Sequence, residues 1–223
     1  MGDAIGQVVS LGVGVAISPV PIIAVVLLLG TPRGRVNGPA FIAGWLAGLA
    51  AAGVIVLFVA GGAGADDDGG SPAWVAVLKL VLGAALLLLG ARQWKQRPRD
   101  TEEAALPKWM QAIDTFSPTR ALAIGVALSA LNPKNLLLTV AAAAAIAQTG
   151  ISTGDELVAL AVFIVIGTLG PGIPVGIYFA LGHRGTAVLD DLERWMGAHN
   201  AAIMTVLLLV IGAKLIGDGI SGL

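Results

Sequence analysis

The sequence predicts an all-α integral membrane protein, built as a single membrane domain of six transmembrane helices over residues 1–223. Hydrophobic residues make up 57% of the chain and charged residues only 12%, whereas about a quarter of a typical soluble domain is charged. Apolar windows of about 20 residues, the length that crosses a bilayer core, recur along the chain. We expect the helices near residues 4–30, 38–64, 73–91, 119–148, 156–182 and 199–217.

Basic residues gather in alternate loops between these helices. The loops after the first, third and fifth helices hold ten of the thirteen Lys and Arg residues: Arg33, Arg35, Arg92, Lys95, Arg97, Arg99, Lys108, Arg120, Arg184 and Arg194. The other loops hold none, and the loop after the second helix contains Asp66, Asp67 and Asp68. Because basic loops stay inside, we expect a multi-pass protein of the cytoplasmic (plasma) membrane with both termini outside and a cytoplasmic loop at residues 92–118.

Two segments of the cytoplasmic loops, residues 109–116 and 189–196, have apolar residues at helical spacing. Each is predicted to form a short amphipathic helix. Such a helix either packs on the inner face of the bundle or contacts lipid or a partner at the membrane surface.

Two short segments of the first half of the chain recur with small changes in the second half. GVAIS at 14–18 matches GVALS at 125–129, and LLLGAR in the third helix resembles LVIGAK in the sixth. The similar segments occur in the same order in both halves. This order suggests a duplicated three-helix unit, with repeat 1 at about 4–91 and repeat 2 at about 119–217. A unit with an odd number of helices must insert the second copy inverted, as in many secondary transporters with broken helices.

Prolines interrupt the first, fourth and fifth helices near their middles, and we expect all three helices to be broken near the midplane. The interrupting residues are Ser18, Pro19 and Pro21 in helix 1, Asn132 and Pro133 in helix 4, and Gly170, Pro171, Gly172 and Pro174 in helix 5. Lipid cannot satisfy the freed backbone groups, so protein, water or a ligand must do so. The breaks therefore predict a shared substrate cavity, although kinks that serve packing are the other interpretation.

Two of the breaks begin with a capping signal. Ser18 and Asn132 each precede a proline, which is the pattern of an N-cap followed by a first helical turn. Each new half-helix would direct its positive N-terminus and its free N–H groups at the membrane centre. The centre is therefore predicted to bind an anion.

Lys134 is predicted to lie near the middle of the fourth helix, where its side chain cannot easily reach water. All fourteen Asp and Glu residues fall in loops or near helix ends, so none can neutralise the lysine at the midplane. Lys134 is then either uncharged or paired with an anion carried by a substrate. A third interpretation is that it contacts backbone carbonyls freed by the helix break.

Other polar residues of the interrupted helices are further candidates for the substrate-binding cavity. They are Ser129, Asn135 and Thr139 in the fourth helix and Thr168 in the fifth. Such residues also commonly join neighbouring helices through hydrogen bonds. The small-residue stripe Ala40, Gly44, Gly48 and Ala52 has a similar ambiguity, because it could close a homodimer or pack inside one subunit.

These motifs make the chain resemble the LysE superfamily of six-helix exporters. That superfamily has a Pro-Gly-Pro element in the first helix and an Asn-Pro-Lys element in the fourth. Here Pro19, Val20 and Pro21 correspond to the first element, with valine in place of glycine, and residues 132–134 match the second. The valine argues against close kinship with the amino-acid exporters of the RhtB kind, since only glycine permits the closest backbone approach.

Within the superfamily, the segment SPVPIIAVVLLLGTPRGR and the long basic loop look most like the GAP group of peptidoglycolipid addressing proteins. The resemblance implies a transporter that moves an anionic cell-envelope glycolipid, or its lipid-linked precursor, across the membrane. An exporter of small amino acids or related solutes is an alternative, because a small anionic substrate would suit the same site. A scaffold of a lipid-export machine that transports nothing is another.

Several functions are not expected. The chain has no cysteine, only two histidines without a metal-binding spacing, and no phosphate-binding glycine loop. It also lacks paired acids, or a nucleophile next to a base, within the apolar segments. We therefore expect neither an enzyme nor a metal or other cofactor, and the expected partners are membrane lipids and the substrate, with no nucleic acid.

Overall fold

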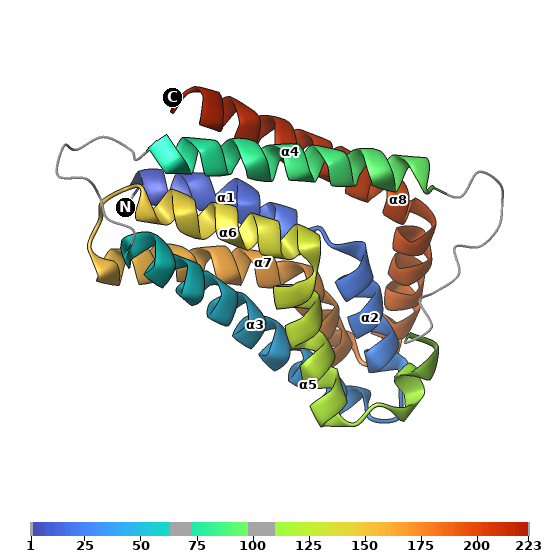
Figure 1. The fold of residues 1–223 in the computed structure, drawn as a ribbon. Coiled ribbons are helices and arrows are strands. Elements are labelled where there is room, and N and C mark those ends of the chain that lie inside the picture. The colour runs from blue at the N-terminus through green and yellow to red at the C-terminus, as the bar shows by residue number, and fades with distance from the viewer. Residues whose placement is uncertain (1, 63–72, 98–109, 223) are drawn as a thin grey trace.

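The computed structural model describes residues 2–62, 73–97 and 110–222, in which all regular secondary structure is helical (Figure 1). Its helices are α1 (Gly2–Ala16), α2 (Pro19–Gly30), α3 (Gly34–Gly62), α4 (Ala73–Lys95), the 3-10 helix η1 (Met110–Thr115), α5 (Pro118–Val126), the π-helix η2 (Ala127–Leu131), α6 (Pro133–Ala147), α7 (Thr153–Leu181) and α8 (His183–Ile220).

Four helices are unbroken and long and apolar enough to cross a membrane: α3, α4, α7 and α8. The pair α1 and α2 bends by 54°, and the segment α5–η2 bends by 61° against α6, and each pair has the length and composition of one more span. Large apolar side chains also face outward, and Phe58 of α3 is 83% exposed. Several apolar helices with apolar outer surfaces make this a multi-pass membrane protein.

The prediction of a break in the fifth helix is wrong, because α7 runs without interruption through Pro171 and Pro174. Gly170 and Ile173 precede these prolines, and neither has a side chain that can cap a new helix, as Ser or Asn can. Gly170 instead lets another helix approach, since a Cβ there would overlap the backbone carbonyl of Ala16 at the end of α1. The Gly-Pro pattern of α7 therefore serves close packing against α1.

The last helix is longer than expected, because α8 begins at His183 and includes the predicted amphipathic segment 189–196. Leu189 and Met196 are buried, whereas Trp195 is 55% exposed. In the other loop segment Trp109 lies outside the described residues, and η1 buries Ile113 against the bundle. The apolar residues of both segments are thus largely packed on the protein itself.

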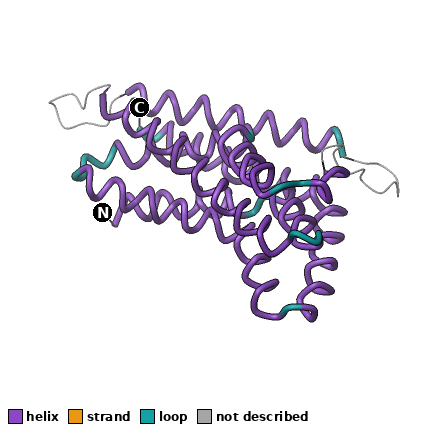
Figure 2. Tube along the Cα trace, turned by 90° about the horizontal axis from the view of Figure 1, so that it is seen from below, coloured by secondary structure: helices purple, strands orange, loops and turns teal. Residues whose placement is uncertain are grey.

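Helix pairs far apart in sequence pack side by side. The antiparallel helices α4 and α8 lie together along much of their length, α1 packs on α7, and α5 packs on α3 (Figures 1 and 2). Both termini lie at one end of the molecule, and α2 and α5 turn away from the layer formed by the antiparallel helices α1 and α6 (Figure 1). The two bends are therefore placed next to each other in the interior.

The small-residue stripe of α3 faces the inside of the subunit. A Cβ at Gly44 would overlap the backbone of Leu122 in α5, and one at Gly48 would overlap the side chain of Ser129 in η2. These glycines allow α3 and the first half of the fourth span to approach closely. The stripe is used for packing within one chain.

Candidate functional site at the helix breaks

The first break separates α1 from α2 at Ile17 and Ser18. Pro19 and Pro21 remove two backbone donors from the first turn of α2, which prevents α1 from continuing. Ser18 occupies the N-cap position, yet its side chain makes no capping hydrogen bond. The prediction that Ser18 opens a new half-helix is confirmed, although its hydroxyl has other partners than the N–H groups of α2.

The second break lies at Asn132, between η2 and α6. Asn132 has an extended backbone, and its side-chain oxygen accepts a hydrogen bond from the Lys134 backbone N–H at 3.0 Å. Pro133 follows as the first helical residue, where its missing N–H costs nothing. The predicted N-cap at Asn132 is confirmed.

Lys134 ties the second break to the first. Its side chain is only 3% exposed, and its ammonium donates to the backbone oxygen of Gly14 at 2.7 Å and of Ile17 at 3.2 Å, and to the hydroxyl of Ser18. These partners use all three ammonium donors. Both carbonyls belong to the C-terminal end of the first half-helix, where the helix dipole is negative.

Of the three interpretations of Lys134, contact with carbonyls freed by the break describes its surroundings in this structure. A helix leaves its last four carbonyls without intrahelical partners, and inside a membrane such groups are costly. Lys134 satisfies two of them at once. The lysine charge and the negative end of α1 therefore stabilise each other.

Asn135 joins the two breaks a second time. The Ser18 hydroxyl lies 2.7 Å from the Val15 carbonyl and 3.2 Å from the Asn135 side-chain oxygen, and its single proton serves one acceptor at a time. The Asn135 amide nitrogen donates to the Leu128 carbonyl at 2.9 Å, in the π-helical turn before the break. Ser18, Lys134 and Asn135 thus form one buried polar network.

A cavity of about 320 Å³, which we call the break pocket, opens beside this network. The predicted residues that line it are Ser18, Pro19, Pro21, Asn132, Pro133 and Lys134. Because the first turns of α2 and α6 both reach the pocket, two positive helix ends face the same space.

Several lining residues of the break pocket lie outside the predicted site. Arg92, Gln93 and Gln96 come from the end of α4, and Asn200 comes from α8. Arg92 takes part in neither of the two ion pairs that the described residues form. The side-chain oxygen of Asn200 is buried and has no hydrogen-bond partner in the described part of the chain.

The break pocket therefore combines an arginine, two positive helix ends and neutral amides. Such a set can bind an anion together with neighbouring hydroxyl groups. Its place at the end of the repeated segment LLLGAR is the one sequence signal that singles out Arg92, which otherwise counts only as a residue of the basic loop.

The remaining predicted site residues do not line the break pocket. Thr139 and Thr168 donate to carbonyls of their own helices, at Asn135 and Ile164. Ser129 is buried against α3, and its hydroxyl donates to Val126. Pro171 and Pro174 are buried within the continuous helix α7. In this structure these residues serve helix packing.

An apolar groove of about 700 Å³ runs between α1 and α8, which contact each other only sparsely. It is lined mainly by aliphatic side chains, and Val13, Val206 and Val210 are well exposed along it. Gly14 and Ile17, whose carbonyls bind Lys134, also line this groove. The end of α1 thus has the polar break pocket on one side and the apolar groove on the other.

A pocket with basic and amide groups that lies across the end of α1 from an apolar groove suits an amphiphile such as a lipid. The family model of Sap, the sulfolipid-1-addressing protein, matches residues 8–221. The chain belongs to the Sap family. No curated protein and no solved structure matches the sequence.

The family match spans both helix breaks, the break pocket and the groove. It confirms the predicted relation to a family of lipid-addressing membrane proteins, which is itself related to the GAP-like proteins. The wider LysE resemblance, carried by residues 19–21 and 132–134, stays a prediction.

Proposed function

We propose that the protein transports an anionic cell-envelope glycolipid, or a lipid-linked precursor, across the cytoplasmic membrane. The head group would bind in the break pocket beside Arg92, and the acyl chains would lie in the groove between α1 and α8. The single observation that carries this proposal is that the end of α1 connects the two sites, which lie on either side of it. The Gly14 and Ile17 carbonyls hold a lysine that lines the pocket, while the same two residues line the groove.

The family name supports an anionic lipid, because a sulfolipid carries a charged sulfate together with long apolar chains. An exporter of small amino acids remains the second candidate, since a cavity of about 320 Å³ is large enough for such a solute. That function would leave the apolar groove without a role. A scaffold that transports nothing would have little use for either site, and nothing in the proposal requires an enzyme.

An inverted repeat would explain how one site is reached from both sides of the membrane. The packing supports it, because α1 contacts α7 as α5 contacts α3, and α4 contacts α8. Both bent spans also break at a polar residue followed by proline. Homodimer formation remains a prediction that would have to use a face other than the stripe at Gly44 and Gly48.

The transport proposal is tested by reconstituting the protein in vesicles and following the transfer of a fluorescent sulfated glycolipid between leaflets. The uncharged parent glycolipid is the comparison substrate, and a fluorescent amino acid tests the second candidate. We expect the sulfated lipid to move fastest. Equal transfer of both lipids, or transfer of the amino acid alone, would contradict the proposal.

Arg92→Met should slow transfer of the sulfated lipid about tenfold or more, because a charge-assisted hydrogen bond contributes roughly 1.5–3 kcal/mol. The matched control is Lys95→Met, which removes a positive charge from an exposed residue at the end of α4 that does not line the break pocket. Equal slowing in both variants would show that surface charge alone matters.

Orientation has its own test, because the chain contains no cysteine. We expect both termini outside, so a thiol introduced by Asp67→Cys should react with an impermeant reagent added outside, and one introduced by Arg97→Cys should not. The opposite labelling would reverse the proposed topology.

A further inference from the structure

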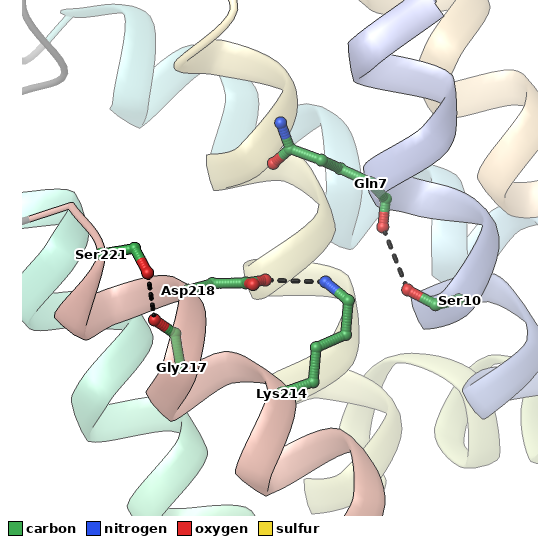
Figure 3. Close-up of polar contacts among 6 residues, drawn as sticks. All are labelled: Gln7, Ser10, Lys214, Gly217, Asp218 and Ser221. Carbon is green, nitrogen blue, oxygen red and sulfur yellow. Dashed lines mark hydrogen bonds and ion pairs between the residues drawn. The ribbon is translucent and has the colours of Figure 1, made fainter.

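A second polar cavity lies near both chain termini, at the opposite end of α4 and α8 from the break pocket. Its volume is about 590 Å³, and we call it the terminal pocket. Among its lining residues are Gln7, Lys79, Gln148, Thr149, Lys214 and Asp218. Figure 3 shows Lys214 and Asp218 on neighbouring turns of α8, and Gln7 on α1.

Two lysines and two aspartates line the terminal pocket, and one of the lysines, Lys79, has no direct partner in the described part of the chain. Lys214 donates to Asp218 at 2.7 Å, so these two charges compensate each other. Lys79 is partly buried, interacts electrostatically with both, and has no ion pair or hydrogen bond of its own among the described residues. Asp3 also lines the pocket but is exposed. A partly buried ammonium without a partner favours an anionic ligand.

The terminal pocket is the structural counterpart of the break pocket. Arg92 is the last residue of LLLGAR and lines the break pocket. Lys214 is the last residue of the similar segment LVIGAK and lines the terminal pocket. The preceding glycines are equivalent as well: Gly90 packs on Leu208 of α8, and Gly212 packs on Gly83 of α4. Two antiparallel helices thus place matching cations at opposite ends of their contact.

The apolar groove leads toward the terminal pocket. Lys214 lines both of them, and Trp195 and His199, which stack at 4.8 Å between ring centroids, line the other end of the groove. From residue 195 to residue 214 an α-helix rises about 28 Å, close to the roughly 30 Å of the hydrocarbon core. The groove therefore extends over most of the thickness of a bilayer.

We infer that the terminal pocket is a second binding site for the anionic head group of the transported lipid, on the opposite side of the membrane from the break pocket. This inference rests on the proposed function. Lys79 and Lys214 would bind the anion, and Gln7, Gln148 and Thr149 would bind sugar hydroxyls. The acyl chains would remain in the groove while the head group exchanges one pocket for the other.

The experiment counts lipid molecules bound to the full chain, purified in a neutral detergent, by native mass spectrometry with a sulfated glycolipid as the probe. We expect two bound lipids in the wild type, one in the double variant Lys79→Met, Lys214→Met, and one in Arg92→Met. Two lipids in the double lysine variant, or one in the wild type, would overturn the inference.

Control variants separate loss of the site from loss of folding. The double variant Lys79→Arg, Lys214→Arg keeps the charges and should bind two lipids, as should Lys95→Met. Thr149→Trp fills the terminal pocket without changing its charge, and it should reduce the count to one. If the double Met variant does not elute as a single species in size-exclusion chromatography, Thr149→Trp alone tests the inference. Two lipids bound to Thr149→Trp would then overturn it.

Two additional measurements complete the experiment. A competition with sulfate identifies the source of the anion, and a comparison of lipid binding with lipid transfer distinguishes failure of this inference from failure of the proposed function. Excess inorganic sulfate should leave the second lipid bound; its displacement would mean a site for free anions and would contradict the inference. Two bound lipids without transfer in vesicles would contradict the proposed function alone. Transfer with a single bound lipid would contradict the second site alone.

Discussion

The two helix breaks begin with the same chemical pattern, a polar residue followed by proline, and they bend the chain by similar angles of 54° and 61°. Their hydrogen bonds nevertheless differ. Asn132 caps its own helix through the backbone N–H of Lys134, so the second break is closed locally. The Ser18 hydroxyl does not cap α2; besides the local Val15 carbonyl it contacts Lys134 and Asn135, more than a hundred residues further along the chain.

This difference shows that the first break depends on the second. Ser18 serves the Val15 and Ala16 carbonyls locally, whereas the Gly14 and Ile17 carbonyls receive their donor, Lys134, from another helix. A change at Lys134 should therefore disturb both breaks, whereas a change of the local cap at Asn132 should affect mainly the second break. The following predictions test this asymmetry.

The largest effect is expected from Lys134→Met, which should abolish lipid transfer while membrane insertion is retained. Loss of the ammonium leaves two backbone carbonyls unpaired, at about 1–3 kcal/mol for each buried group. Lipid transfer in vesicles and thermal unfolding in detergent measure the two effects. Full transfer by this variant would contradict a central role for the lysine, and Lys95→Met serves as the charge control.

Ser18→Ala should have an intermediate effect, lowering the free energy of unfolding by about 1–3 kcal/mol, because a buried partner of both Lys134 and Asn135 is lost. The two carbonyl bonds of Lys134 remain, so transfer should fall without disappearing. Thermal unfolding combined with a double-mutant cycle between Ser18→Ala and Asn135→Ala measures the coupling. Strictly additive effects would show that the hydroxyl does not join the two breaks.

Asn132→Ala should cost about 1 kcal/mol, the usual value of an N-cap side chain. The effect should be confined to the start of α6, because the side-chain oxygen of Asn132 contacts only the local backbone. Hydrogen exchange of the backbone amides locates the change, and Asn132→Asp, which also caps well, is the matched control. Faster exchange at the end of α1 as well would show that the Asn132 cap also supports the first break, and would contradict the proposed difference between the two breaks.

The smallest effect is expected from Pro171→Ala, since α7 is already a continuous helix at that position. Transfer should stay near that of the wild type, whereas Pro133→Ala should straighten the fourth span and reduce it. Both variants are compared in the same vesicle assay. Equal loss of transfer in the two variants would mean that the bend in the fourth span has no special role.

The sequence by itself determined which segments are apolar enough to cross a membrane and where two of them bend. Hydropathy located the spans, and the dipeptides at Ser18 and Asn132 marked the breaks because a cap followed by proline is a local signal. Six of the fourteen residues that line the break pocket followed from the same breaks. The fifth helix was mispredicted because proline alone does not decide between a break and a continuous helix.

Only the tertiary structure decided the partners of these residues. It assigned Lys134 to the end of α1, brought Arg92 and Asn200 into the break pocket, and let Gly170 accommodate the α1 backbone within an intact α7. Capping by a neighbouring residue is encoded in a few consecutive positions. A hydrogen bond between residues 14 and 134 exists only when packing brings two distant helices within 3 Å, and no local pattern specifies that distance.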